Sequence, residues 1–197
     1  MTEELTEAVQ AEPVPEEHQK SFLRDLLEIV LLALVIYIVI IFLVQTVHVM
    51  GQSMEPTLQN DDFLIASKIS YRLHAPQRGD IVVFRPSTDP AHDYIKRIIG
   101  IPGDHLRIVN AQVFINGRQL KEAYLNEAWT SFNTWNNGEE QVVPPDSYFV
   151  MGDNRNHSTD SRYLGYQKKD QFLGKAWVRV WPLTDIRVFS SGIPYAS

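Results

Sequence analysis

An unbroken apolar run from Ile29 to Val44 places the strongest constraint on what this chain can fold into. The run belongs to nineteen consecutive uncharged residues between Glu28 and His48. At ~1.5 Å per residue, a helix of that length spans roughly 28 Å, close to the ~30 Å hydrocarbon core of a bilayer. The run therefore predicts one transmembrane anchor helix, which we place at residues 21–48.

Two other interpretations of the run are weaker. A cleaved secretory signal has an apolar stretch of ~7–15 residues followed by a small-x-small cleavage site, and the run fits neither feature. A soluble protein would need a larger domain to bury a helix that is apolar on every side. Lys20 and Arg24 precede the run, whereas no lysine or arginine follows it until Lys68. We therefore expect a single-pass protein of the cell membrane, with a cytoplasmic N-terminus and residues 49–197 on the far side.

Charge and composition also change at this run. Residues 1–28 carry eight acids and two bases, whereas the rest of the chain carries sixteen of each. Residues 1–20 are acidic and poor in large apolar side chains, so we expect a disordered cytoplasmic tail. The neutral remainder gives nucleic-acid binding no electrostatic support. The chain has no cysteine, which excludes disulfides, thiol catalysis and cysteine-ligated zinc.

Beyond the run, short β-rich segments alternate with turn signals, and no stretch after residue 50 has a long helical period. Asn116-Gly117 between apolar segments is a strong hairpin signal, and Asn110-Ala111 separates two segments that are close enough to pair. Residues 49–197 are therefore expected to form one mainly β domain, an antiparallel sheet or partly closed barrel. The expected strands are Phe63–Ala66, Asp80–Phe84, Tyr94–Ile99, His105–Val109, Gln112–Ile115, Ser147–Met151 and Ala176–Trp181.

Residues 122–141 match neither the helical nor the strand period and are expected to form a long loop. The loop carries three large aromatic residues, Trp129, Phe132 and Trp135. Two arrangements are open for them. They lie at the lipid headgroups beside a membrane-tethered domain, or they pack back onto the sheet as a small cluster, which we favour.

Ser53 lies just past the apolar run, in a segment that starts at Val49 and ends at Leu58. A serine hydroxyl becomes a useful nucleophile when a neighbouring base takes its proton. Of the six histidines, His157 is the only candidate for a triad, and neither flank resembles a strained nucleophile elbow. The other candidate base is a lysine, provided that burial lowers its pKa from ~10.4 towards neutrality.

Lys96 fits this demand better than the other lysines that follow the run. It lies in a predicted strand in which Tyr94 and Ile98 share its face, while Arg97 points to the opposite face. The remaining lysines lie in or beside polar or turn-like stretches. From the residues alone, however, we favour a lysine whose stem packs at a strand edge while its amine reaches water.

Four segments resemble successive signature motifs of type I signal peptidases, also called leader peptidases, and they follow the anchor in the family's order. The segments are Ser53–Leu58, Arg78–Phe84, Tyr94–Asp104 and Gly152–Arg162. The resemblance implies a prokaryotic membrane-bound serine endopeptidase with an all-β catalytic fold. Such an enzyme removes N-terminal signal peptides from exported proteins, cutting after small-x-small sequences through an acyl-enzyme. It uses a Ser-Lys dyad and calls for no metal or cofactor.

The resemblance also implies roles for individual residues. Ser53 matches the nucleophile, Lys96 matches the general base, and Ser158 matches a second serine whose hydroxyl bonds to the lysine amine. The Ser53 backbone N–H is expected to bind the oxyanion, and Gly51 stands where some relatives supply a side-chain hydroxyl as a second donor. Asp153, Asp160 and Arg162 match a polar network that supports the site. An ion pair is expected between Asp160 and Arg162.

The substrate is expected to bind as an added β-strand between the segment before Ser53 and the strand that carries Lys96. The expected partners are signal peptides of preproteins and the lipid bilayer, and we expect the enzyme to act as a monomer. Rival functions are another Ser-Lys protease of similar fold or a membrane-tethered domain that only binds export partners. The candidates for lining shallow apolar substrate pockets are Val49, Met50, Met54, Leu58, Tyr94 and Ile95.

Overall fold

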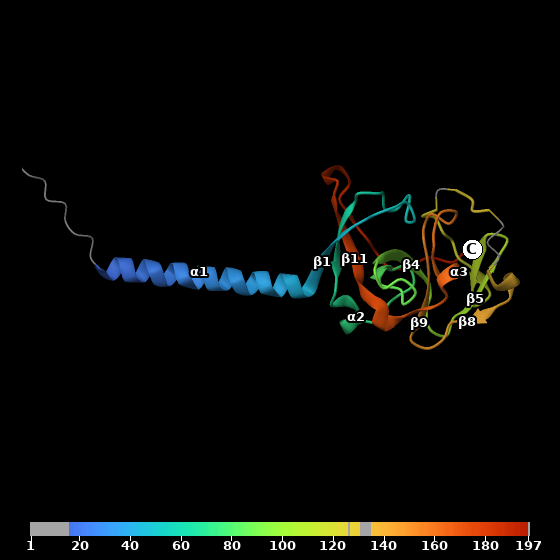
Figure 1. Cartoon of the computed structure of the whole chain (residues 1–197), viewed down its shortest axis with the longest axis horizontal. Coiled ribbons are helices and arrows are strands. Elements are labelled where there is room, and N and C mark those ends of the chain that lie inside the picture. Colours follow the sequence, from blue (N-terminus) through green and yellow to red (C-terminus); the bar gives the residue numbers. More distant parts are fainter. Residues whose placement is uncertain (1–15, 126, 131–134, 197) are drawn as a thin grey trace, which may run out of the picture. The chain divides into compact units, whose positions relative to one another are not determined.

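The computed structural model of the protein describes residues 16–125, 127–130 and 135–196, so most of the expected tail lies outside the described residues. The described part begins with helix α1, Glu16–Leu43, which includes residues 16–20 that we expected to be disordered (Figure 1). Its segment Phe22–Leu43 is long and apolar enough to span a membrane, and none of that segment is buried inside the protein. The chain divides into a helical unit and a β-rich unit, with the boundary between Ile41 and Phe42.

The helix ends before the expected end of the anchor at residue 48. Residues Val44–His48 instead form strand β1, which pairs antiparallel with β2, Phe63–Ser67. The apolar run itself stops at Val44, and the next four residues mix polar Gln45 and His48 with β-branched Thr46 and Val47. Such a segment suits the edge of a sheet better than the interior of a bilayer, and β2 supplies the backbone partners.

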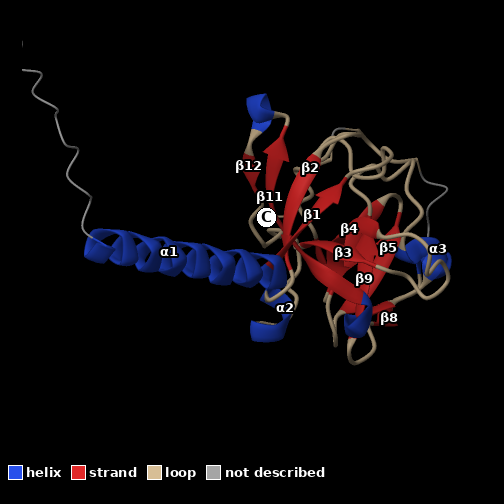
Figure 2. Ribbon diagram, turned by 60° about the vertical axis from the view of Figure 1, so that its left-hand side comes forward, coloured by secondary structure: helices blue, strands red, loops and turns tan. Residues whose placement is uncertain are grey.

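The main sheet has eight strands, all paired antiparallel, and curls into a partly open barrel (Figure 2). Its order is β1-β2-β11-β3-β4-β9-β10, with β12 added to β11. The further strands of this sheet are β3 Ile81–Phe84, β4 Tyr94–Gly100, β9 Ser147–Met151, β10 Gln167–Lys168, β11 Phe172–Trp181 and β12 Arg187–Val188. This confirms the predicted mainly β fold, and every predicted strand of this sheet is present. The ends of β9 are as predicted, those of β2, β3 and β4 differ by one residue, and β11 begins four residues earlier than predicted.

A second sheet has the order β7-β6-β5-β8 and is also antiparallel. Both predicted hairpins are present, because Asn110-Ala111 connects β5 to β6 and Asn116-Gly117 connects β6 to β7. All four turn residues have positive φ, as a two-residue hairpin turn of this type requires. The strands of this sheet are β5 His105–Val109, β6 Gln112–Ile115, β7 Arg118–Gln119 and β8 Gln141–Val142.

The helices of the described β-rich unit are single turns. They are α2 Ser70–Leu73, α3 Ser161–Leu164, η1 Trp135–Gly138, η2 Lys169–Gln171 and η3 Leu183–Asp185.

The aromatic loop packs back onto the protein where it is described. Trp129 is buried in the apolar cluster between the two sheets, and the Trp135 ring packs against Phe149 of β9 at a tilt of 59°, with ring centroids 4.8 Å apart. Phe132 lies outside the described residues.

Candidate active site

Ser53 lies in a turn that follows β1 and is fixed from both sides. Before it, the Val49 N–H donates to the Asp62 carbonyl at 2.8 Å. After it, the side chains of Met54 and Leu58 are buried in one apolar cluster. The Ser53 carbonyl accepts a hydrogen bond from the Asn154 N–H at 3.0 Å, which ties the turn to the loop after β9. The apolar residues on either side of the serine therefore hold its polar turn in place.

The amine of Lys96 contacts the Ser53 hydroxyl from β4, a strand distant from β1 in the sheet order. Lys96 belongs to β4, and its Nζ donates to Ser53 Oγ at 2.6 Å and to the Ile95 carbonyl at 3.0 Å. The lysine is only 4% exposed. Among the described residues, no carboxylate forms an ion pair with this amine. The structure thus brings together the two residues that the sequence singled out as nucleophile and base.

The surroundings of Lys96 favour its neutral amine. Burial lowers the pKa of Lys96 from its ordinary 10.5 to about 8. The carboxylates of Asp160 and Asp153 raise this pKa, and the guanidinium of Arg162 lowers it, but burial has the largest effect. A base with a pKa near 8 is partly neutral at physiological pH, whereas an ordinary lysine is almost entirely charged. The sequence-based requirement of a desolvated lysine is therefore met at this position.

The loop after β9 is organised by Asp160. Its carboxylate accepts hydrogen bonds from the Gly152 N–H at 3.0 Å and from the Ser158 hydroxyl at 2.8 Å. The predicted ion pair with Arg162 is present, with Arg162 Nε 2.8 Å from Asp160 Oδ1. Ser158 differs from expectation, because its hydroxyl donates to Asp160 and makes no hydrogen bond to the Lys96 amine. The buried carboxylate is the stronger acceptor and lies two residues away.

Gly152 allows this loop to approach the serine closely. A Cβ atom at this position would lie 2.2 Å from Ser158 Oγ and 2.4 Å from the Ser53 carbonyl oxygen. Both distances are far below van der Waals contact, so a side chain here would displace either the serine turn or the loop. The Gly152 backbone is therefore part of what sets the geometry of the site.

Asp153 pairs with an arginine that the sequence reasoning did not assign to the site. Arg97 Nε and Nη2 bind the two Asp153 carboxylate oxygens at 2.8 and 2.6 Å, and the Thr57 hydroxyl donates to the same carboxylate at 2.5 Å. All three side chains are at least partly buried. This network joins β4, the serine turn and the loop after β9. The only signal in the sequence was the adjacency of Arg97 to Lys96 on opposite faces of one strand.

A second buried arginine, Arg155, connects the same loop to the start of the aromatic loop. Both of its terminal nitrogens bind the Glu122 carboxylate, one of them at 3.0 Å, and its Nε donates to the Gly152 carbonyl at 3.1 Å. Its guanidinium lies 5.0 Å from the ring centre of Trp129. The aromatic loop therefore braces the loop of the candidate site, a role that its sequence did not predict.

A groove of about 680 Å³ runs past Ser53 and Lys96. Five of the six candidate substrate-binding residues line it, whereas Leu58 is fully buried in the core and does not. Met54 is also almost fully buried, while Met50 is 78% exposed at the rim. The candidates that line the groove are Val49, Met50, Met54, Tyr94 and Ile95.

His157 lines the same groove but does not serve the serine. Its side chain is exposed, and among the described residues its ring makes no hydrogen bond to Ser53. The hydroxyl is contacted by the lysine amine instead. The geometry therefore favours a serine–lysine pair over a serine–histidine pair.

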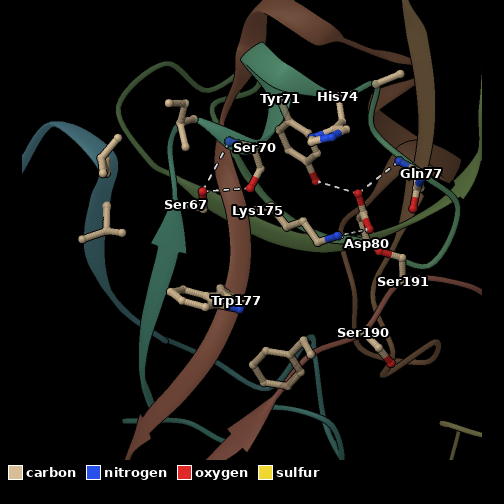
Figure 3. A pocket seen from close by; sticks show the side chains of 15 residues that line it. Ser67, Ser70, Tyr71, His74, Gln77, Asp80, Lys175, Trp177, Ser190 and Ser191 are labelled. Atoms are coloured by element: carbon tan, nitrogen blue, oxygen red, sulfur yellow. Dashed lines mark hydrogen bonds and ion pairs between the residues drawn. The ribbon is translucent and has the colours of Figure 1, made fainter. Parts of the chain in front are cut away.

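A second lysine–serine contact lies in a separate hollow of about 640 Å³ (Figure 3). Lys175 Nζ is 2.6 Å from Ser191 Oγ, the same distance as in the Lys96–Ser53 contact. However, Lys175 also forms an ion pair with the buried carboxylate of Asp80 at 2.8 Å. An ion-paired ammonium has no free electron pair to take a proton from serine. Burial and Asp80 raise the pKa of Tyr71, whose hydroxyl donates to Asp80 at 3.3 Å, so this cluster is structural.

The chain is similar to known signal peptidases in sequence. The family model described as signal peptidase, peptidase S26, matches residues 23–181. A probable signal peptidase I-2 from Synechocystis sp. is 46% identical over 148 residues, covering 72% of this chain and 65% of the relative, just under two thirds of its length. Signal peptidase IB from Staphylococcus aureus is 31% identical over 182 residues, covering 86% of this chain and 94% of the relative. A solved signal peptidase I from Enterococcus faecalis is 35% identical with a TM-score of 0.45, covering 52% of this chain and 97% of that one.

Proposed function

Because this chain belongs to the peptidase S26 family of signal peptidases, we propose that it removes signal peptides with Ser53 as nucleophile and Lys96 as general base. The single observation that carries the assignment of residues is the contact of 2.6 Å between Lys96 Nζ and Ser53 Oγ. The contact is supported by the burial of the lysine and by its lowered pKa. The substrate is a preprotein whose signal peptide ends in a small-x-small sequence, and the enzyme acts as a monomer.

The reaction begins with the neutral form of Lys96. In that form the Ser53 hydroxyl donates its hydrogen bond to Nζ, and the amine takes the proton as the serine oxygen attacks the scissile carbonyl. The resulting ammonium then protonates the departing amine of the mature protein. A water molecule, deprotonated by the same lysine, hydrolyses the acyl-enzyme and releases the signal peptide.

The negative oxygen of the tetrahedral intermediate is bound by the Ser53 backbone N–H. Among the described residues, none accepts a hydrogen bond from this N–H, so it is free to donate. Gly51 supplies no second donor, because its own N–H donates to the Asn60 side chain at 2.7 Å. An oxyanion hole with one protein donor gives less stabilisation than one with two, where each donor contributes ~3–4 kcal/mol.

The substrate binds in the groove as an extended strand between the segment before Ser53 and β4. Val49, Met54 and Ile95 present apolar surface beside the serine, and the first two are almost fully buried. A shallow wall of this kind admits alanine-sized side chains and excludes large ones. Met50 lies at the exposed rim, where it contacts the substrate farther from the scissile bond.

The same proposal includes a location for the enzyme. Helix α1 crosses a cell membrane once, with the N-terminal tail in the cytoplasm and the catalytic domain, residues 49–197, on the far side. Support comes from the apolar segment Phe22–Leu43 and from the basic residues Lys20 and Arg24 before it. A signal peptide that emerges from the same membrane then meets the groove without diffusing through bulk water.

Processing of a precursor peptide with a small-x-small site tests the proposal. The full chain is expected to cut after that site, and Ser53→Ala and Lys96→Ala are each expected to lower the rate by at least ~10⁴-fold. Lys121→Ala is the matched control, because it removes an exposed lysine that does not line the groove, and it should cut normally. Intact processing in both variants would refute the roles of Ser53 and Lys96, whereas no cleavage by the wild type would favour a domain that only binds export partners.

A further inference from the structure

The described surface carries an open basic hollow, distinct from the groove of the candidate active site. It has a volume of about 900 Å³ and lies between the end of β2, helix α2, and the segments around β10. Four cationic and two anionic side chains line it, a net charge of +2, although residues 29–197 are neutral as a whole. The cations are Lys68, Arg72, Lys168 and Lys169, and the anions are Asp146 and Asp170.

Most of these cations are not neutralised within the protein. Arg72, Lys168 and Lys169 are exposed, and among the described residues none of their side chains forms an ion pair. Three unpaired cations around one hollow repel each other and attract an anion. The neighbouring hollow of Figure 3 differs, because its lysine, Lys175, is paired with Asp80.

A backbone hydrogen bond links one residue of this hollow to the last residue of α1. The Lys68 N–H donates to the carbonyl of Leu43, the last residue of α1, at 2.9 Å. Gln45, two residues beyond the helix, also lines the hollow. If α1 spans the hydrocarbon core, its last residue lies at the boundary with the headgroups, and Lys68 must lie at that level too.

We propose that this basic hollow binds the phosphate group of an anionic membrane lipid. The cations supply the charge that the phosphate needs, and the connection of Lys68 to Leu43 puts the hollow at the depth where lipid phosphates are found. Side chains of Tyr71, Phe172 and Leu173 add apolar surface for the part of the lipid nearest the glycerol. This proposal relies on the proposed membrane anchor but not on the peptidase chemistry.

A bound lipid would give the catalytic unit a second attachment to the membrane besides the helix. Gln45 lines both the basic hollow and the groove beside Ser53, so the two sites are neighbours. The lipid would therefore hold the entrance of the groove near the surface from which a signal peptide emerges. With two attachments, the catalytic unit cannot rotate freely about the helix, whereas the helix alone would allow this rotation.

Binding of a soluble short-chain lipid tests this without measuring activity. The full chain in neutral detergent is titrated with dioctanoyl phosphatidylglycerol, and the bound fraction is measured by native mass spectrometry. Dioctanoyl phosphatidylcholine is the uncharged comparison. We expect the triple variant Arg72→Gln, Lys168→Gln, Lys169→Gln to bind phosphatidylglycerol at least about tenfold more weakly, and the binding to weaken with salt.

The matched control removes three cations from the region of the second sheet. Its variant is Arg107→Gln, Arg118→Gln, Lys121→Gln, which changes the net charge equally and also replaces exposed residues. We expect this control to bind phosphatidylglycerol like the wild type. Equal binding by all three proteins, or an equal loss in both variants, would overturn the proposal, because no specific site would then exist. The urea midpoint of each variant shows that its fold is intact.

Two further experiments test whether the hollow instead binds free phosphate or an acidic part of the substrate. Excess inorganic phosphate is expected to leave the bound lipid in place. If phosphate displaces the lipid completely, the hollow is a simple ion site.

In the second experiment, cleavage of a precursor with acidic residues after the cleavage site is measured in lipid-free detergent. If the basic-hollow variant raises KM there while lipid binding is unchanged, the hollow takes the substrate and the lipid proposal is wrong.

Discussion

Replacing Lys96 with methionine is expected to abolish activity. It is also expected to remove the free-energy penalty that the buried charged lysine imposes on the folded protein. Methionine has nearly the same length, but it carries no charge into the buried position. Burial lowers the pKa of Lys96 from 10.5 to about 8. At ~1.4 kcal/mol per pH unit, this difference corresponds to about 3 kcal/mol by which the charged lysine destabilises the folded protein.

The sign of the effect follows from proton binding. Between pH 8 and 10.5 the unfolded chain holds the Lys96 proton more often than the folded protein does, so wild-type stability rises with pH across this window. Below about pH 8 the full cost is present, and above about 10.5 it has vanished. The methionine variant lacks this dependence. Its lost hydrogen bonds to Ser53 and Ile95 cost about 1 kcal/mol each at any pH.

The assay is urea unfolding of the full chain in detergent, from pH 7 to pH 10.5. All four tryptophans lie between Trp129 and Trp181, so their fluorescence reports on the β-rich unit alone. The free-energy difference between the methionine variant and wild type should fall by about 3 kcal/mol from pH 7 to pH 10.5. Lys121→Met, at an exposed lysine, should show no such change. A difference that stays constant with pH would refute the reasoning about burial.

Three further outcomes are expected. The kcat/KM for a precursor peptide should rise about tenfold per pH unit below about pH 8 and level off above it, as Lys96 loses its proton; a flat profile would exclude a lysine base. Gly152→Ala should lower the processing rate at least ~100-fold, because the new Cβ would lie 2.4 Å from the Ser53 carbonyl oxygen; wild-type rates would show that the turn moves freely. Glu122→Gln should lower the free energy of unfolding by about 3 kcal/mol, because it leaves Arg155 buried with an uncharged partner; an unchanged urea midpoint would argue against the brace.

Local patterns in the sequence predicted most of the fold. Asn116-Gly117 and Asn110-Ala111 specify tight turns by their tolerance of positive φ, so both hairpins of the second sheet could be placed. Alternation in Tyr94–Ile99 predicted that Lys96 and Tyr94 share a face of β4, and Lys96 Nζ lies 5.4 Å from the centre of the Tyr94 ring. Strand β1 was missed, because its residues continue the uncharged stretch that begins in the anchor, and only its pairing with β2 shows that it is a strand.

The supporting contacts of the candidate site could not be found in this way. Arg97 and Asp153, like Glu122 and Arg155, are far apart in the sequence and carry no local signal of pairing. The partner of Ser158 also depends on tertiary geometry, because a serine hydroxyl can bond to a carboxylate as well as to an amine. The structure directs it to Asp160.

The most direct test of the central claim is the mass of the acyl-enzyme. The full chain is mixed with a precursor peptide, quenched in acid within one turnover, digested and analysed by mass spectrometry. We predict that the signal-peptide fragment is attached to the peptide that contains Ser53, and that Lys96→Met shows no such adduct. An adduct at Ser158 or Ser191, or processing with no adduct at any serine, would contradict the proposed roles of Ser53 and Lys96.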